Sequence, residues 1–419
     1  MIVTQEFAWF VGVDWASQSH QVCLLDAHGE GLAQRAVTHG GAGITELCDW
    51  LLARTAAPAE MIAVAIEVPH GPVVEALLER GFRVHAINPK QLDRFRDRFT
   101  VAGAKDDRRD ARVLANSLRT DRHAFRVLSA DDPVIVELRE WSRMVDDLQQ
   151  ERSRLANRVR EQLWRYYPQM LEIAEDYAAD WFLDLWRQAP TPAKAARLRQ
   201  TTLERFLKTH RIRRWQAPEL ARVLKQKPLL VASGVAEAAA AHIHAVAARI
   251  RLVNQQLKTA YRQLDQLCDR LVPPEDNAPG QRCEQHDVAI LRSMPGLGRI
   301  ILAVLLAEAW QPLGRRDYHA LRCLSGVAPI TRRSGKTCLV VRRYACNKRL
   351  ENALYHWARV AVQHDEPSRR RYAALRGRGH SHGRALRTVA DRLLAVACTL
   401  LQHHTLFDPA HQAREAVAA

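Results

Sequence analysis

The sequence predicts a mixed α/β domain followed by a longer, mainly helical region. Three observations support this prediction: the N-terminal part alternates β-rich apolar runs with helical periodicity, heptad-like apolar spacing occupies the middle, and apolar helices with a basic segment follow. A chain of 419 residues is too long for one compact core. We therefore expect domains at 1–128, 129–284 and 285–419.

Composition is that of a folded globular protein, with 47% hydrophobic and 26% charged residues. The longest apolar run, residues 300–309, is shorter than the roughly 20 residues that span a bilayer, and the N-terminus lacks a basic leader. The eight cysteines are dispersed without a C-x-x-C pair. We expect a cytoplasmic protein with reduced thiols, no membrane association, no zinc site and no disulfide framework.

The N-terminal elements begin with three antiparallel strands over residues 7–40, because FAWFVGVDWA, HQVCLLDAHG and LAQRAVTHG are β-rich runs ending in turn signals. The elements expected next are a helix over 44–54, a buried strand over 61–68, a helix from near Pro69, a strand over 82–87 and helices through Leu118. The order β-β-β-α-β-α-β-α predicts a mixed sheet covered by helices.

Two segments in the middle of the chain have the spacing of coiled-coil helices. The apolar positions of the first are Leu138, Trp141, Val145, Leu148, Leu155, Val159 and Leu163, and those of the second are Ile243, Val246, Ile250, Val253, Leu257, Ala260, Leu264, Leu267 and Leu271. Arg152 interrupts the first series. The helices could pair within one chain as an antiparallel hairpin or between chains, and both options stay open. The polar segment between them, about 169–228, is expected to be helical.

The C-terminal region is expected to begin near Val288 with two apolar helices joined by the sequence PGLG. This is the form of a helix-hairpin-helix, in which a glycine turn brings backbone N–H groups to phosphate oxygens, so Gly296 and Gly298 are candidate nucleic-acid contacts. A glycine turn joining two core helices is the structural alternative. A basic loop over 326–350 and two further helices up to about His403 should follow.

Positive charge is concentrated in one part of the chain. Of the formal net charge of +16, residues 315–392 carry +14, from 19 Lys and Arg against 5 Asp and Glu. Surfaces that only confer solubility usually mix both signs, whereas a confined basic surface is typical of phosphate binding. We expect a nucleic-acid partner. The candidate contacts from the basic loop are Arg332, Arg333, Lys336, Arg342, Arg343, Lys348 and Arg349.

Four carboxylates are candidate metal ligands. Asp14 ends the first strand in VGVDWAS, Glu67 ends a buried strand in AVAIEVP, and Asp107 and Asp110 lie one helical turn apart in KDDRRDARVLA. Oxygen ligands gathered at one sheet edge suit two divalent cations about 4 Å apart, with Mg²⁺ expected and Mn²⁺ an alternative. Asp106, four residues before Asp110, is a rival for Asp107. Each acid taken alone has a common structural explanation.

The four acids in this strand order resemble the RuvC-like branch of the ribonuclease H fold, which occurs in Holliday-junction resolvases. The C-terminal stretches MPGLG, SGVAP, RRSGK and NKRL add a second set of motifs. Together the two sets resemble the DEDD insertion-sequence transposases of family one-ten, which are related to the pilin-gene invertases. The similarity spans nearly the whole chain and is weakest over 169–228.

This resemblance implies a RuvC-like N-terminal domain, central coiled-coil helices and a C-terminal transposase domain. It implies that Asp14, Glu67, Asp107 and Asp110 bind metal and that Ser334 is the nucleophile, forming a covalent serine-phosphate link to DNA. It also implies a structured bridge RNA that selects the donor and target double-stranded DNA. Assembly from dimer to tetramer, with active sites shared between subunits, and action at the nucleoid are implied as well.

The chemistry needs help from outside the serine segment, because Ser334 has no neighbouring His or Asp to act as a base. Metal ions could supply the activation, while Arg332, Arg333 and Lys336 counter the charge of the transition state. Ser325 in CLSGVAP is the competing nucleophile. Two other functions remain: a metal-dependent resolvase or nuclease that uses only the carboxylates, and a non-catalytic architectural protein that binds nucleic acid.

Overall fold

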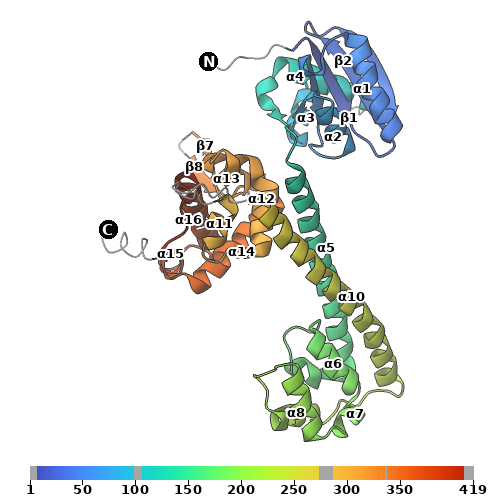
Figure 1. The fold of residues 1–419 in the computed structure, drawn as a ribbon, viewed down its shortest axis with the longest axis vertical. Coiled ribbons are helices and arrows are strands. Elements are labelled where there is room, and N and C mark those ends of the chain that lie inside the picture. Colours follow the sequence, from blue (N-terminus) through green and yellow to red (C-terminus); the bar gives the residue numbers. More distant parts are fainter. Residues whose placement is uncertain (1–6, 99–105, 273–285, 336, 410–419) are drawn as a thin grey trace, which may run out of the picture. The chain divides into compact units, whose positions relative to one another are not determined.

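The computed structural model describes residues 7–98, 106–272, 286–335 and 337–409. The chain forms two compact units, Met1–Asp132 and Pro133–Ala419, which are described separately below (Figure 1). The first is the mixed α/β part that the sequence predicts, and the second is mainly helical. The expected division of the second part between 129–284 and 285–419 stays a prediction.

A six-stranded mixed sheet forms the centre of unit 1, in the order β3-β2-β1-β4-β5-β6. Its strands are β1 (Trp9–Asp14), β2 (Ser19–Asp26), β3 (Gly31–Thr38), β4 (Ile62–Ile66), β5 (Arg83–Ala86) and β6 (Arg126–Val127). Strand β1 pairs antiparallel with β2 and parallel with β4, and β4 pairs parallel with β5. The mixed sheet and its first three antiparallel strands are confirmed.

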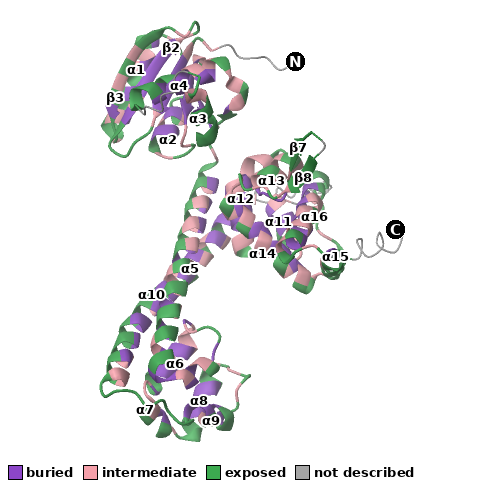
Figure 2. Ribbon diagram, turned by 180° about the vertical axis from the view of Figure 1, so that it is seen from behind, coloured by how far each residue is buried: buried purple, intermediate pink, exposed green. Residues whose placement is uncertain are grey.

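Helices cover both faces of this sheet. They are α1 (Gly41–Thr55), α2 (Pro72–Glu79), α3 (Pro89–Arg96) and α4 (Asp107–Thr120), with 3-10 turns η1 (Ala59–Met61) and η2 (Arg122–Ala124). Because side chains alternate along a strand, Val11 and Val13 of β1 pack into the core beneath α1 and α2, whereas Phe10 packs into a second core with α3 and α4. The buried residues of Figure 2 follow the strands between these two helical layers.

Unit 2 is built on a pair of long antiparallel helices, α5 (Pro133–Tyr166) and α10 (Val235–Arg270). Arg270 pairs with Glu137 at 3.0 Å, which joins the end of α10 to the beginning of α5. The two predicted coiled-coil segments therefore pair within one chain. Their apolar positions are buried as predicted, from Leu138 to Leu163 on α5 and from Ile243 to Leu267 on α10, with Trp141 partly exposed.

Arg152 interrupts the apolar spacing of α5 because it belongs to a polar layer between the long helices. Its Nε donates to Asn254 Oδ1 at 2.8 Å, and Asn254 Nδ2 donates to the carbonyl oxygen of Ala178 at 2.9 Å and to Asp180 Oδ1 at 2.8 Å. The polar layer thus joins α5, α10 and the insert. A buried polar pair of this kind fixes the register of two helices that apolar contacts alone would leave free to slide.

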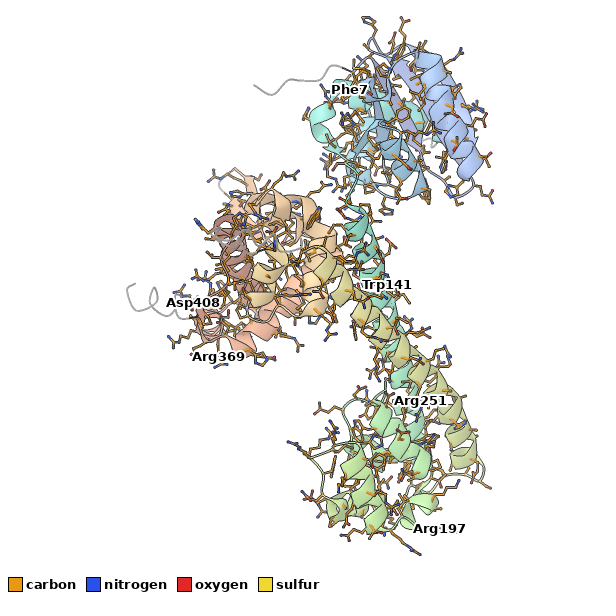
Figure 3. The ribbon with its side chains drawn as sticks, in the orientation of Figure 1. Phe7, Trp141, Arg197, Arg251, Arg369 and Asp408 are labelled. Carbon is orange, nitrogen blue, oxygen red and sulfur yellow. The ribbon has the colours of Figure 1, made fainter. Side chains whose placement is uncertain are left out.

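The insert between the long helices is helical, as expected. It contains η3 (Pro168–Glu172), α6 (Asp180–Gln188), α7 (Pro192–Ala196), α8 (Gln200–Thr209) and α9 (Ala217–Leu224). Arg251, labelled in Figure 3, donates to Asp184 Oδ1 at 2.7 Å and so attaches α6 to α10. The insert shares one continuous apolar core with the long helices.

The C-terminal part of unit 2 contains a cluster of helices and one β-hairpin. These elements are α11 (Asp287–Ser293), α12 (Arg299–Gly314), α13 (Tyr318–Leu324), β7 (Ile330–Ser334), β8 (Thr337–Val341), α14 (Lys348–His364), α15 (Glu366–Gly377) and α16 (His382–His403). None of the helices in the described ranges is long and apolar enough to cross a membrane. The seven cysteines that fall in those ranges are all free.

Two expectations for this part were wrong. The segment expected to be a basic loop contains the antiparallel hairpin β7–β8, since Thr337 to Val341 includes a β-branched run with high strand propensity. Three helices follow it instead of two. The break between α14 and α15 comes from Pro367 in the first turn of α15 and from Asp365, whose side chain caps that turn by accepting from the Ser368 N–H at 3.0 Å.

Candidate functional site

Asp14 and Glu67 lie at the same edge of the unit 1 sheet. Strands β1 and β4 are parallel and in register up to Val13 and Ile66, so the next residue of each strand is one of the two acids. Both side chains are partly exposed, whereas the residues before them are buried. The backbone therefore carries two carboxylates side by side to the rim of an apolar core.

Helix α4 brings two further acids to this edge. Gly12 of β1 permits the approach, because a Cβ atom there would lie 1.9 Å from the carbonyl oxygen of Ala111 and 2.6 Å from the amide nitrogen of Ala115. Contact at this distance places the first turn of α4, with Asp107 and Asp110, beside the end of β1. No larger residue than glycine fits between the strand and the helix.

Asp106 and Asp107 have different surroundings. Asp106 is the N-cap of α4, and its Oδ1 accepts a hydrogen bond from the Arg108 N–H at 3.2 Å. Asp107 lies in the first turn and acts electrostatically on Asp14. Because the cap already uses the Asp106 carboxylate, these contacts favour Asp107 as the member of the acid cluster.

The four acids share one electrostatic environment centred on Asp14. Burial raises the pKa of Asp14 from 3.8 to about 6, and the negative charges of Asp110, Asp107 and Glu67 add to the rise in that order. Arg96 is the cation that opposes it. The other three predicted acids thus lie close enough to Asp14 to act on its charge, and a divalent cation would relieve this repulsion.

Arg96 pairs with the most buried of these acids. Its Nε donates to Asp110 Oδ1 at 2.7 Å, and its Nη1 contacts Asp93 Oδ1 at 2.5 Å. The Asp110 side chain is only 2% exposed, and its Oδ2 is buried with no hydrogen-bond partner among the described residues. Sequence analysis did not single out Arg96, whose only signal was its position three residues after Asp93.

The acid cluster suits a metal ion by the chemistry of its ligands rather than by their present arrangement. Within the described ranges, no three His, Cys, Asp or Glu side chains are arranged as a ready-made metal site. The donor chemistry nevertheless suits Mg²⁺, since the cluster offers carboxylate oxygens alone and the buried Asp110 Oδ2 has no hydrogen-bond partner among the described residues. Asp110 binds Arg96 through Oδ1 and keeps Oδ2 without a hydrogen-bond partner in the described part of the chain, so one of its oxygens is left for a cation.

The predicted nucleophile Ser334 ends β7 at the tip of the hairpin in unit 2. Ser334, Arg332 and Arg333 are all exposed, and Gly335 turns the chain with a φ of 54°. Lys336 lies outside the described residues. The rival Ser325 is 1% exposed, and its hydroxyl donates to the carbonyl oxygen of Leu321 at 2.7 Å. Only Ser334 of the two presents its hydroxyl to solvent.

The other basic candidates differ in how far their charge is used within the protein. Arg342 and Lys348 are exposed and share Glu351, and Arg343 Nε donates to the Ala328 carbonyl oxygen at 3.3 Å. Arg349 has the most contacts. Its guanidinium binds Glu308 at 2.7 Å, Asp146 at 2.8 Å and the Ser142 hydroxyl at 3.0 Å. These contacts give Arg349 a structural role in joining α14 to α12 and α5.

The two candidate glycines of the turn between α11 and α12 also differ. Gly296 has a φ of 76°, and a Cβ atom there would lie 2.6 Å from the amide nitrogen of Ala361 on α14. Trp357 Nε1 donates to the Pro295 carbonyl oxygen at 2.9 Å, which holds the turn against α14. Gly298 is exposed, begins α12 as its N-cap and faces open space. Gly296 therefore serves packing, and only Gly298 offers an accessible backbone.

Comparison with known proteins matches both units to transposases. A family profile described as a transposase matches residues 11–168, which include the four acids, and one described as the IS116/IS110/IS902 transposase family matches residues 288–373, which include the hairpin. Each profile covers less than half of the chain.

Individual relatives extend the similarity over the full length. The chain is 36% identical over 412 residues to a mini-circle protein of Streptomyces coelicolor named as a candidate transposase for IS117, with 95% of each chain covered. It is 26% identical over 412 residues to a protein of insertion element IS900 from Mycobacterium paratuberculosis, covering 96% and 97%. A Sinorhizobium fredii protein, y4uE, named as a candidate transposase, is 58% identical over 223 residues, and this match spans 62% of its length.

Proposed function

Because this chain belongs to the IS116/IS110/IS902 family of transposases, we propose that it cuts and rejoins DNA to move an insertion sequence. The observation that carries the proposed chemistry is the gathering of Asp14, Glu67, Asp107 and Asp110 at one edge of the unit 1 sheet. In the absence of a cation, repulsion within such a cluster lowers the stability of unit 1. A role in binding cations therefore explains the four carboxylates better than a structural role does.

Unit 1 is proposed to have the RuvC-like form of the ribonuclease H fold. The support is its strand arrangement, with β1, β2 and β3 antiparallel, β4 and β5 parallel to β1, and helices on both faces. The acids stand at the end of β1, just after β4 and in the first turn of α4, which is the placement that the resemblance implies.

Asp14, Glu67, Asp107 and Asp110 would hold two Mg²⁺ or Mn²⁺ ions. Bound divalent cations supply Lewis-acid stabilisation of the attacking and leaving oxygens at the scissile phosphate. The protein's own contribution is to hold the four carboxylates on a rigid strand and helix. Because Asp14 has a pKa of about 6 before loading, its carboxylate is ionised and ready to bind at neutral pH.

Ser334 is the proposed nucleophile. Its Oγ would form a bond to phosphorus as the bond to the DNA leaving oxygen breaks, with the hydroxyl proton lost and the leaving oxygen becoming a strand-end hydroxyl. Arg332 and Arg333, exposed on the same strand, would neutralise the negative charge of the pentavalent transition state. Because one phosphate ester replaces another, the strands can be resealed without ATP.

Guidance by a structured bridge RNA, action at the nucleoid and assembly into a dimer or tetramer complete the proposal. The family resemblance implies them, and the basic segment 315–392 supplies a surface suited to polyanions. An oligomer would also let the serine of one subunit act with the acids of another. RNA that co-purifies with the protein from its native host should therefore be a discrete species encoded beside the gene.

The deciding experiment follows the covalent intermediate. The full-length protein, supplied with its co-purified RNA, is incubated with Mg²⁺ and a duplex carrying the ends of the insertion sequence, and protein-DNA adducts are detected after denaturation. S334A and D14N should form no adduct while still binding DNA. S325A is the matched control and should retain the adduct, because the Ser325 hydroxyl is buried at the C-terminal end of α13.

The same experiment distinguishes the alternatives. An adduct that persists in S334A refutes the assignment of the nucleophile. Metal-dependent cleavage without any adduct, unchanged in S334A, would indicate a resolvase or nuclease that uses only the carboxylates. Binding that is identical with Mg²⁺ and with chelator, and never followed by cleavage, would indicate an architectural protein.

A further inference from the structure

A hollow of about 310 Å³ lies in unit 2 at the base of the hairpin that carries Ser334. It is bounded by the residues that follow α13 and β8 and by one face each of α14 and α16, elements that Figure 1 shows grouped together. Its polar lining consists mainly of Arg342, Lys348, Glu351, Asn352, Tyr355 and Arg387. A volume of this size accommodates a small ligand or one group of a larger one.

The wall of the hollow is held in place by close packing. Gly326 has a φ of 75°, and a Cβ atom there would lie 2.7 Å from the Sγ of Cys346. The Asn347 N–H donates to the carbonyl oxygen of Leu324 at 2.8 Å, which joins the loop before α14 to the end of α13. Because these backbone contacts fix both sides, the hollow belongs to the fold itself.

The charges around the hollow do not balance. It is lined by three cations and one anion, Glu351, which pairs with both Arg342 and Lys348. Arg387 forms no ion pair and no side-chain hydrogen bond with any residue in the described ranges. Burial, and then repulsion from Arg342, lowers the pKa of Arg387 from its usual value. A partly buried guanidinium that makes no direct ion pair, with Glu351 acting on it only at longer range, favours the binding of an anion.

Phosphate is the anion that this lining fits. The net charge of the lining is about two positive, which exceeds the single negative charge of a backbone phosphodiester and leaves a net attraction for it. The guanidinium of Arg387 offers the bidentate geometry that phosphate oxygens accept, and the amide of Asn352 and the ring of Tyr355 add polar and flat surface beside it.

We propose that this hollow is a phosphate pocket in which Arg387, Arg342 and Lys348 hold one backbone phosphate of the nucleic acid on which the hairpin acts. The proposal rests on the proposed function, since it assigns a subsite to the same nucleic-acid surface. Arg342 follows β8 and lies five residues after Thr337, the partner of Ser334, which corresponds to about 17 Å at about 3.3 Å per residue. The pocket would therefore bind the strand about five nucleotide steps from Ser334, at about 3.4 Å per step along a duplex.

The experiment measures how the full-length protein binds fluorescent 30-nucleotide DNA and RNA of one sequence, by anisotropy, at several KCl concentrations. R387Q should weaken binding about 10-fold or more near 0.1 M salt, as expected for a lost charge-assisted hydrogen bond. In a plot of log affinity against log salt concentration, the slope for R387Q should be less steep than that for the wild type by about 0.7. This is the value for one phosphate contact on a single strand.

R359Q is the matched control, because it removes the same charge from an exposed position on α14 outside the pocket. It should change affinity less than about 3-fold. K348Q, at an exposed lysine, is the second pocket variant if R387Q fails to fold, and it should also exceed the control. Inorganic phosphate, added at constant ionic strength, should compete with DNA for binding to the wild-type protein. It should not compete for binding to R387Q.

Each result has one meaning. Equal losses in R387Q and R359Q overturn the pocket and leave a general basic surface, and so does unchanged binding by R387Q while the wild type binds well. Inorganic phosphate that binds only to the wild type, without any effect of R387Q on DNA or RNA, identifies a free-phosphate site and overturns the proposal. A wild-type protein that binds neither polymer refutes the proposed function itself.

Discussion

Replacing Asp14 by Asn tests how strongly the four acids repel one another in the metal-free protein. Burial and the charges of Asp110, Asp107 and Glu67 raise the pKa of Asp14 in the folded state to about 6, while the unfolded chain keeps a value near 3.8. A raised carboxyl pKa contributes stability that is fully present below pH 3.8 and is lost as the pH rises through about 6. Above that pH the ionised cluster opposes folding.

The size of the effect follows from this difference. About two pH units at about 1.36 kcal/mol each correspond to about 3 kcal/mol, which solvent screening of the partly exposed Asp14 reduces to about 1–2 kcal/mol. Asparagine removes the charge and keeps the shape. We expect D14N to raise the free energy of unfolding of unit 1 by this amount at pH 8 in chelator.

The assay is hydrogen exchange of the full-length protein, measured by mass spectrometry on peptides covering β1 and β4. In chelator, D14N should slow exchange of these strands about 5- to 30-fold, whereas E79Q, an exposed charge on α2, should change it less than about 2-fold. Mg²⁺ should slow exchange in the wild type and have little effect in D14N. Faster exchange in D14N in chelator would refute the reasoning, because it would mean that the Asp14 carboxylate stabilises the fold.

Three further substitutions, one of them with a matched control, test the packing of the two units. G12A should lower the stability of unit 1 by about 3 kcal/mol or more, measured by thermal denaturation, because its Cβ would overlap the backbone of α4. G296A should destabilise unit 2 by about 1–3 kcal/mol, whereas G298A, which faces open space, should change it by less than about 1 kcal/mol in the same urea titration. N254L should lower the midpoint of urea unfolding, with a loss of about 1–3 kcal/mol, because it leaves the Arg152 guanidinium without its amide partner.

The sequence predicted secondary structure correctly where a segment had a single clear apolar pattern. The apolar runs before Asp14 and Glu67 specified two buried strands, and their parallel pairing brings both acids to one edge. The apolar spacing from Ile243 to Leu267 specified the long helix α10. Pairing within the chain could not be predicted, because it depends on Arg152 and Asn254, which interrupt the apolar pattern and become complementary only when the helices face each other.

Features that depend on distant contacts were missed. The hairpin β7–β8 was not predicted because both of its strands are exposed and β7 contains two arginines. Such strands lack the alternation of apolar and polar residues that identifies a half-buried strand. The internal contacts of Arg349 could not be predicted, because sequence shows a charge without showing its partners, Glu308 and Asp146. Arg96 and Arg387 were missed because the contacts that matter, with Asp110 and with the pocket lining, join different elements of the fold.

The ion pair between Arg96 and Asp110 gives the most buried acid of unit 1 a counter-ion that belongs to the fold. An internal counter-ion lets newly made protein close its core over Asp110 without waiting for Mg²⁺ from the cell. Many small metal-binding domains cannot do this, since they collapse only around the ion. Folding of unit 1 then does not depend on the concentration of divalent cations around the newly made chain.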